Sequence, residues 1–281
     1  MEEQLTLIRE QQKDSWNKFS PGWKKWDDTT MSFLKPMGDE IIKRLKLKET
    51  DYVLDVAAGT GEPGLTIAGI VKKGKVMGTD LSEGMLKVAN ENAKLRGIEN
   101  YKTQLSDVSE LPFDDNTFDA ISCRFGYMFF PDMLIATKEM YRVLKPGGRI
   151  ATSVWNTSDK NFWVTATMST INNNMKLDPP PPGAPGMFRC AASGLVVELF
   201  EKAGLKNVSE TIVNGKLNSE TLEKYWDMMN DVAAPVVSAL SKTDDLTKSK
   251  IKNEVFELVN EKFKGESITF DSSALVICGE K

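Results

Sequence analysis

Between Tyr52 and Trp155 short apolar segments alternate with longer amphipathic ones, and this alternation limits the chain to few folds. The short segments have the length of buried strands, and the longer ones carry apolar residues at helical spacing. Strands are predicted at 52–56, 76–79, 101–105, 118–123 and 149–155, and helices at 63–71, 82–96 and 132–144. Strands and helices that alternate at this spacing form parallel sheets covered on both faces. The sequence therefore predicts an α/β fold built on a mostly parallel sheet.

The segments before this region are predicted to be helical. One helix is expected over 2–19, ended by Pro21-Gly22, and a second near 36–47. We expect residues 1–48 to form an N-terminal helical arm or lid.

After Trp155 the strand–helix rhythm breaks. Residues 156–190 are polar and Asn-rich, with an extended, exposed stretch expected at Pro179–Pro182. Further helices are predicted at 192–203, 219–231 and 246–263, and further strands at 207–213 and 273–278. We expect residues 49–281 to form the main domain, with insertions at about 156–190 and 216–265 that cap the sheet.

The chain contains no histidine among its 281 residues. This excludes Ser-His-Asp and Cys-His hydrolysis, His-ligated zinc and histidine bases. Cys123, Cys190 and Cys278 form no CxxC pair, so we expect no metal site. Acid–base chemistry must use other side chains, or a cofactor must supply the chemistry.

Charge and hydropathy limit the partners and the location. The chain has 36 basic and 40 acidic residues, a net charge of −4, which gives no general attraction to nucleic acid. Its N-terminus does not resemble a signal peptide, and no apolar run approaches the roughly 18 residues of a bilayer span. Few, widely separated cysteines suit a reducing compartment. We therefore expect a cytoplasmic protein with no integral membrane segment and no nucleic-acid partner, in an oligomeric state that the sequence leaves open.

A glycine-rich turn follows the first predicted strand. Residues Gly59–Gly64 match G-x-G-x-x-G between a strand and a helix, the context in which this motif binds a cofactor. Gly59 and Gly61 allow a sharp turn and a close approach of ligand to backbone. Asp80 ends the second strand, where an acidic side chain can accept hydrogen bonds from a ribose diol. These two features suit either a nicotinamide or an adenosyl cofactor.

Further motifs separate these two cofactors. Asp55 lies inside the first strand, and Ser106-Asp107-Val108 follows the third. The segment Leu111–Asp119 leads into the fourth strand, and Leu144–Gly148 follows the helix after that strand. In order and spacing, residues 51–155 resemble the class I S-adenosylmethionine-dependent methyltransferases, in the group that includes the ubiquinone/menaquinone-biosynthesis methyltransferases. The resemblance implies a Rossmann-like, seven-stranded sheet with helices on both faces and an inserted helical cap. The segment 273–278 would be its antiparallel strand, in a hairpin with 207–213.

The resemblance also implies a role for particular residues. The methionine moiety would be lined by Asp55, Ala57, Gly59 and Gly61, with Asp55 near its amino group. Asp80 would hold the ribose hydroxyls, and Leu81 and Met85 would flank the adenine. Asp107 would accept from the adenine amino group, and the Val108 backbone would meet the ring. Arg124 follows the fourth strand, at the boundary between cofactor and acceptor.

Aromatic and methionine side chains are predicted to line a pocket for the methyl acceptor. The candidates are Trp23, Trp26, Phe125, Met128, Trp155 and Trp226. Rigid rings and flexible methionines suit a small, apolar or aromatic acceptor. Tyr127 is the candidate base nearest by motif position, although a packing role suits it as well.

Three alternatives remain open at this point. The glycine loop with Asp80 also permits a nicotinamide-dependent oxidoreductase, although the segment before the first strand argues against it. A protein that binds S-adenosylmethionine without catalysis is a second alternative. A methyltransferase of nucleic acid or protein is the third. The acceptor atom, whether carbon, oxygen or nitrogen, is not determined by the sequence.

Overall fold

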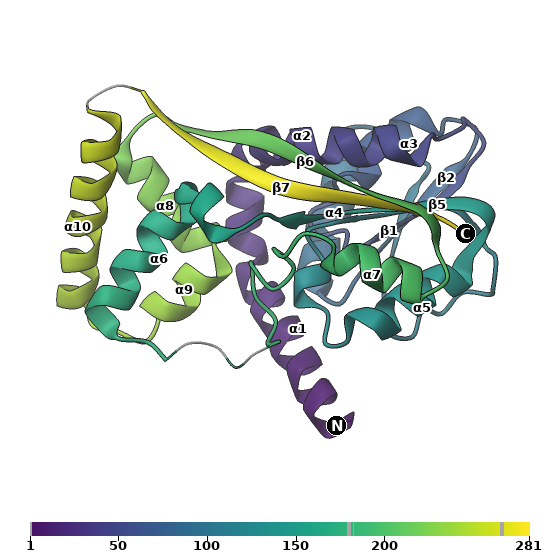
Figure 1. Cartoon of the computed structure of the whole chain (residues 1–281). Coiled ribbons are helices and arrows are strands. Elements are labelled where there is room, and N and C mark those ends of the chain that lie inside the picture. The colour runs from purple at the N-terminus through teal and green to yellow at the C-terminus, as the bar shows by residue number, and fades with distance from the viewer. Residues whose placement is uncertain (1, 179–180, 182, 265–266) are drawn as a thin grey trace.

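One sheet of seven strands organises the molecule (Figure 1). The computed structural model describes residues 2–178, 181, 183–264 and 267–281. The strands lie in the order β3-β2-β1-β4-β5-β7-β6, and β7 is antiparallel to both of its neighbours. Their bounds are β1 (Tyr52–Val56), β2 (Lys75–Asp80), β3 (Tyr101–Leu105), β4 (Phe118–Arg124), β5 (Leu144–Trp155), β6 (Lys206–Ser219) and β7 (Ile268–Glu280). The predicted α/β fold, with a mostly parallel sheet and one antiparallel strand, is confirmed.

Helices cover both faces of the sheet, as predicted. On one face α2 (Asp27–Leu45), α3 (Gly64–Ile70) and α4 (Glu83–Leu95) bury apolar side chains against the strands. On the other face lie α5 (Met133–Val143) and α7 (Leu195–Lys202). Ser82 caps α4, as expected from sequence, by accepting a hydrogen bond from the Met85 amide at 3.1 Å.

The first helix is longer than predicted. Helix α1 spans Glu2–Lys25 and runs through Pro21, which was expected to end it. Proline lacks the N–H that would bond to the carbonyl of Asn17. The hydroxyl of Ser20 donates to that carbonyl instead, at 2.9 Å, so the acceptor is not left without a partner. Helix α2 likewise begins well before the predicted start and contains Pro36, because its buried residues begin at Thr30.

The region after β5 is more helical than its composition suggested. Helix α6 (Phe162–Met175) lies within the polar segment where the rhythm was expected to break. It buries Thr167 and Thr170, and the Thr170 hydroxyl bonds to the carbonyl of Ala166 at 2.9 Å. Helix α9 (Ala234–Leu240) was not predicted either. Of the proline stretch expected to be extended and exposed, residues 179, 180 and 182 lie outside the described residues.

A long antiparallel hairpin connects the cap to the sheet. Strands β6 and β7 pair from Lys206 opposite Glu280 to Ser219 opposite Ile268, well past the predicted ends of both strands. The far end of this hairpin reaches the group formed by α6, α8 (Leu222–Val232), α9 and α10 (Asp245–Phe263) (Figure 1). The domain boundaries drawn from the sequence stay a prediction.

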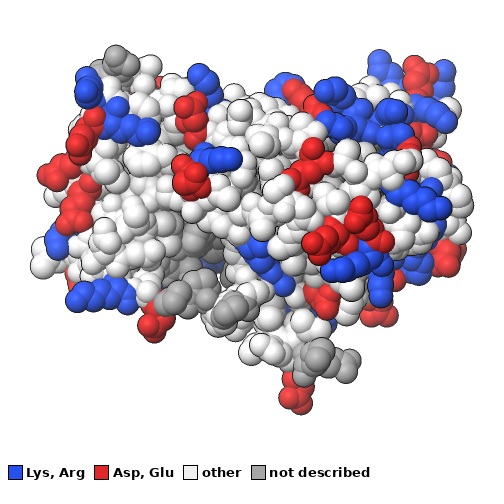
Figure 2. Space-filling view, in the orientation of Figure 1, with Lys and Arg blue, Asp and Glu red and all other residues white. Residues whose placement is uncertain are grey.

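The molecular surface carries both signs of charge. On the face shown in Figure 2, basic and acidic side chains are interspersed. Over the described residues, no helix has both the length and the apolar character that crossing a bilayer requires.

Candidate functional site

A large cavity lies at the carboxyl edge of the parallel strands. Its walls include residues that follow β1, β2, β3 and β4, together with Trp155 at the end of β5. Side chains from α1, α2 and the cap close it from the other side. About 1440 Å³ of the cavity is free of atoms, part of it open to solvent. Open α/β sheets bind ligands at this edge, so the cavity is the candidate site.

The two glycines of the glycine-rich turn have different roles. A Cβ added at Gly59 would meet nothing within 4 Å, and Gly59 lines the cavity. A Cβ added at Gly61 would lie 2.7 Å from a methyl group of Leu65, beneath the turn. Gly59 therefore leaves its backbone open to a ligand, whereas Gly61 allows the helix after it to pack closely.

Asp55 lies beneath this turn rather than on the cavity wall. Its side chain accepts hydrogen bonds from the Gly64 amide at 3.0 Å and from the Ser122 hydroxyl at 2.6 Å. Burial raises the pKa of Asp55 to about 7, although these bonds and the charge of Arg124 favour the carboxylate. A pKa of about 7 places the ionisation of Asp55 close to neutral pH.

Asp80 lines the cavity and accepts hydrogen bonds from backbone amides on two sides of it. One carboxylate oxygen accepts from the Gly59 amide at 2.9 Å, and the other accepts from the Ser82 amide at 2.9 Å. Burial raises the pKa of Asp80 above its usual range. The lone pairs that remain on both oxygens can accept hydrogen bonds from a ligand.

The expected adenine-binding residues converge on the same cavity. Leu81, Met85, Asp107 and Val108 all line it. Asp107 accepts from the Ser109 amide at 2.8 Å and forms an ion pair with Arg9 of α1.

Helix α1 forms part of this site, in line with the arm or lid predicted for residues 1–48, and it contributes more residues than the predicted Trp23. Gln12 and Trp16 line the cavity beside Trp23. Asn17 accepts from the Ser82 hydroxyl at 2.7 Å and from the Gly84 amide at 3.0 Å, at the start of α4. The polar residues Gln12 and Asn17 were not predicted; the available signal was their helical spacing relative to the aromatic residues of α1.

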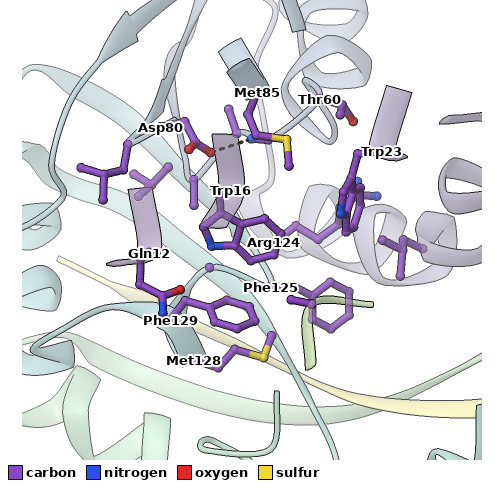
Figure 3. Close-up of a pocket in the computed structure, with 18 of the residues that line it drawn as sticks. Gln12, Trp16, Trp23, Thr60, Asp80, Met85, Arg124, Phe125, Met128 and Phe129 are labelled. Atoms are coloured by element: carbon purple, nitrogen blue, oxygen red, sulfur yellow. Dashed lines mark hydrogen bonds between the residues drawn. The ribbon is translucent and has the colours of Figure 1, made fainter. Parts of the chain in front are cut away.

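A cluster of aromatic side chains forms the opposite part of the cavity. Trp155 stacks on Phe125, with ring centres 4.2 Å apart, and on Phe33, with centres 5.8 Å apart. Trp163 of α6 packs against both Phe33 and Trp155. In the view of Figure 3, Phe125, Met128 and Phe129 lie on one side of Trp16, and Asp80 and Met85 lie on the other. The cavity thus has one part with carboxylates and another that is apolar and aromatic.

Four of the six predicted acceptor-pocket residues reach the cavity: Trp23, Phe125, Met128 and Trp155. The structure does not bring Trp26 or Trp226 there. The indole N–H of Trp26 donates to Asp231 at 2.8 Å, outside the cavity. Trp226 is buried within the cap, because α8 turns Met228 and Val232 toward the cavity, on another side of the helix.

Tyr127, the candidate base, does not line the cavity either. Its side chain is fully buried, and its hydroxyl shares a hydrogen bond of 3.0 Å with Thr137. Burial raises the pKa of Tyr127 well above its usual range. The structure therefore gives Tyr127 a packing position, with its hydroxyl bonded to Thr137 rather than facing the cavity.

Known proteins resemble this chain in sequence and in structure. Residues 27–167 match the model of the ubiE/COQ5 methyltransferase family. A demethylmenaquinone methyltransferase of Geobacillus stearothermophilus is 40% identical over 110 residues, which cover 39% of this chain and 47% of that relative. The chain thus matches about half the length of the curated relatives.

Two solved structures share the fold. The YcgJ protein of Bacillus subtilis has a TM-score of 0.58 at 22% identity, over 87% of this chain and 97% of its own. A SAM-dependent methyltransferase of Aquifex aeolicus has a TM-score of 0.51 at 26% identity, over 68% of this chain and 89% of its own.

Proposed function

The chain belongs to the ubiE/COQ5 methyltransferase family, and we propose that it transfers a methyl group from S-adenosylmethionine to a small, apolar, planar acceptor. One observation carries this proposal. A single cavity combines the open backbone at Gly59 and the carboxylate of Asp80 with the stacked rings of Phe125 and Trp155. The first pair suits an adenosyl cofactor, and the second suits a flat acceptor.

The residues of the carboxylate part fit this cofactor. Asp80 has free lone pairs for the ribose hydroxyls, and Asp107 has them for the adenine amino group. Leu81, Met85 and Val108 supply apolar surface for the adenine ring. When bound, S-adenosylmethionine supplies a methyl group on a sulfonium that is already activated toward nucleophiles.

The remaining task of the chain is to align the acceptor and to exclude water. Phe33, Phe125 and Trp155 offer stacking surfaces, and Met128 and Met228 can adapt to the outline of a ring. Without histidine, and with Tyr127 outside the cavity, we propose an acceptor that is acidic or intrinsically nucleophilic. The name of the Geobacillus relative supports a quinone-related ring as the first class to test.

Calorimetry with S-adenosylmethionine and S-adenosylhomocysteine tests the cofactor. Both ligands are expected to bind with micromolar affinity, and NADH is expected not to bind. Absence of binding at millimolar concentration would refute the proposal. Binding of NADH instead would favour the oxidoreductase alternative.

A screen with methyl-labelled cofactor tests the acceptor. We expect label transfer to a quinol or phenol, and less to sterols and aliphatic amines, which do not match the stacked rings. Tight cofactor binding with no transfer to any acceptor of the panel would favour a protein that binds the cofactor without catalysis.

Tyr127→Phe is expected to leave methyl transfer within about threefold of the wild type, because the hydroxyl faces Thr137 rather than the cavity. The loss of one buried hydrogen bond should lower the free energy of unfolding by about 1 kcal/mol. Initial rates with the acceptor found in the screen, together with urea unfolding, measure both effects. A rate loss above about a hundredfold with unchanged stability would restore Tyr127 as a candidate base.

A further inference from the structure

One cation faces the cavity without a carboxylate partner. Over the described residues, Arg124 is the only lysine or arginine that lines it. No ion pair within 4.0 Å joins Arg124 to a described carboxylate, and its one side-chain contact of hydrogen-bond type is to the sulfur of Met31 at 3.7 Å. The acidic groups nearby lie outside ion-pair range, so the N–H donors of this guanidinium remain available to a ligand that brings an anion.

A second donor in the same cavity also has no partner. The indole N–H of Trp23 is buried and meets no hydrogen-bond acceptor among the described residues. In the view of Figure 3 the side chain of Arg124 extends in the direction of Trp23. Two unpaired donors that line one cavity indicate that its ligand carries acceptor oxygens.

The position of Arg124 shows which part of a ligand these donors would meet. A Cβ added at Gly38 of α2 would lie 3.8 Å both from the guanidinium of Arg124 and from the side chain of Pro63. Burial lowers the pKa of Arg124, and the charges of Glu62 and Asp55 at the glycine-rich turn, together with Asp27 of α2, oppose that shift. The guanidinium is therefore next to the turn, in surroundings that offer one cationic group and three acidic ones.

This inference rests on the proposed function. We propose that Arg124 and the indole N–H of Trp23 bind the carboxylate of the amino-acid portion of S-adenosylmethionine. The assignment of the ribose to Asp80, and of the adenine to Leu81 and Met85, leaves the amino-acid portion for the region beside the turn. That portion carries one carboxylate and one ammonium, which match Arg124 and the nearby acidic groups. Helix α1 then contributes Trp23 to the cofactor site rather than to the acceptor pocket alone.

The test compares two ligands that differ only by this carboxylate: S-adenosylmethionine and decarboxylated S-adenosylmethionine. Calorimetry on the full chain gives the affinity of each for the wild type and for Arg124→Met, which keeps the length of the side chain and removes the charge. We expect Arg124→Met to lose about 10- to 100-fold in affinity for S-adenosylmethionine. Its affinity for the decarboxylated ligand should stay within about threefold of the wild-type value.

Trp23→Phe keeps an aromatic ring and removes only the N–H. We expect it to lose about 3- to 10-fold for S-adenosylmethionine and nothing for the decarboxylated ligand. Trp26→Phe is the matched control, because the indole of Trp26 is bonded to Asp231 outside the cavity. It should leave both affinities unchanged.

Three results would overturn the assignment. Equal losses for both ligands in Arg124→Met would mean that Arg124 only supports the structure. Unchanged cofactor affinities with a raised KM for the acceptor would assign Arg124 to an oxyanion of the acceptor. Unchanged cofactor affinities with an unchanged KM for the acceptor would mean that Arg124 binds neither molecule. A wild type that binds neither ligand would instead refute the proposed function itself, which is a distinguishable failure.

Discussion

Asp80→Ala is expected to weaken the binding of S-adenosylmethionine by at least about 100-fold. Asp80 is proposed to accept two hydrogen bonds from the ribose, and a bond to a charged group contributes about 1.5–3 kcal/mol. The same carboxylate also holds the Gly59 and Ser82 amides, at 2.9 Å each, so its loss loosens both walls of the site. Calorimetric titration of the variant against the wild type measures the effect.

A control is needed because Asp80 also has a structural role. Asp119 provides it: this carboxylate likewise accepts from a backbone amide, that of Tyr52 at 2.8 Å, at the opposite end of β1 from the cavity. Asp119→Ala should lower stability without changing the affinity for the cofactor. Equal affinities for Asp80→Ala and the wild type would remove the ribose assignment.

The affinity for S-adenosylmethionine is expected to rise about 100-fold between pH 5 and pH 7 and to level off above pH 7. Burial raises the pKa of Asp55 from 3.8 to about 7, so the ligand-free protein holds a proton there at pH 5. The cofactor brings a sulfonium and an ammonium, and nearby positive charge favours the carboxylate. Binding must then release the proton, which costs roughly tenfold in affinity for each pH unit below 7.

The raised pKa of Asp55 also makes the stability of the ligand-free protein depend on pH. A carboxyl with a raised pKa keeps its proton in the folded state when the unfolded chain has lost it. The ligand-free protein therefore loses stability as the pH rises from about 4 to about 7, and a cationic ligand recovers that loss.

Asp55→Asn is the matched variant, because the amide keeps the shape and cannot ionise. It should bind weakly, with a much flatter dependence on pH. Any slope that remains is assigned to Asp80, whose pKa burial also raises. A wild-type affinity that does not change between pH 5 and pH 7 would contradict the prediction.

The sequence predicted those site residues whose positions are determined by the ends of the parallel strands. Asp80 and Asp107 come at or just after the ends of β2 and β3, and Gly59 follows β1. Because the carboxyl ends of parallel strands share one edge, residues at these positions must converge once the strand order is right. Local sequence around each strand was sufficient for that.

The part that the sequence did not predict depends on how helices pack. Whether Trp23 of α1, Trp26 between α1 and α2, or Trp226 of α8 faces the cavity is decided by how these helices pack, which no local pattern determines. Trp23 reaches the cavity and Trp26 does not, although both come from one short segment. Arg9 and Asn17 were missed for the same reason, because their partners are distant in sequence.

The helices missed in the cap have a different cause. Helix α6 is rich in Thr and Asn, which have poor helix propensity, and it forms because it packs against α9 and α10. Helix α1 continues past Pro21 because Ser20 supplies the missing donor. Tertiary contacts outweigh local propensity in both places.

The position of β7 has a consequence for synthesis of the protein on the ribosome. Strand β7 comes last in sequence, yet it lies between β5 and β6 and bonds to both. While the nascent chain lacks β7, β5 presents a bare edge and β6 has no place in the sheet. Such an edge is a template for pairing with other chains. The β5 edge thus stays open to misassembly while α8, α9 and α10 are translated, until β7 has left the exit tunnel.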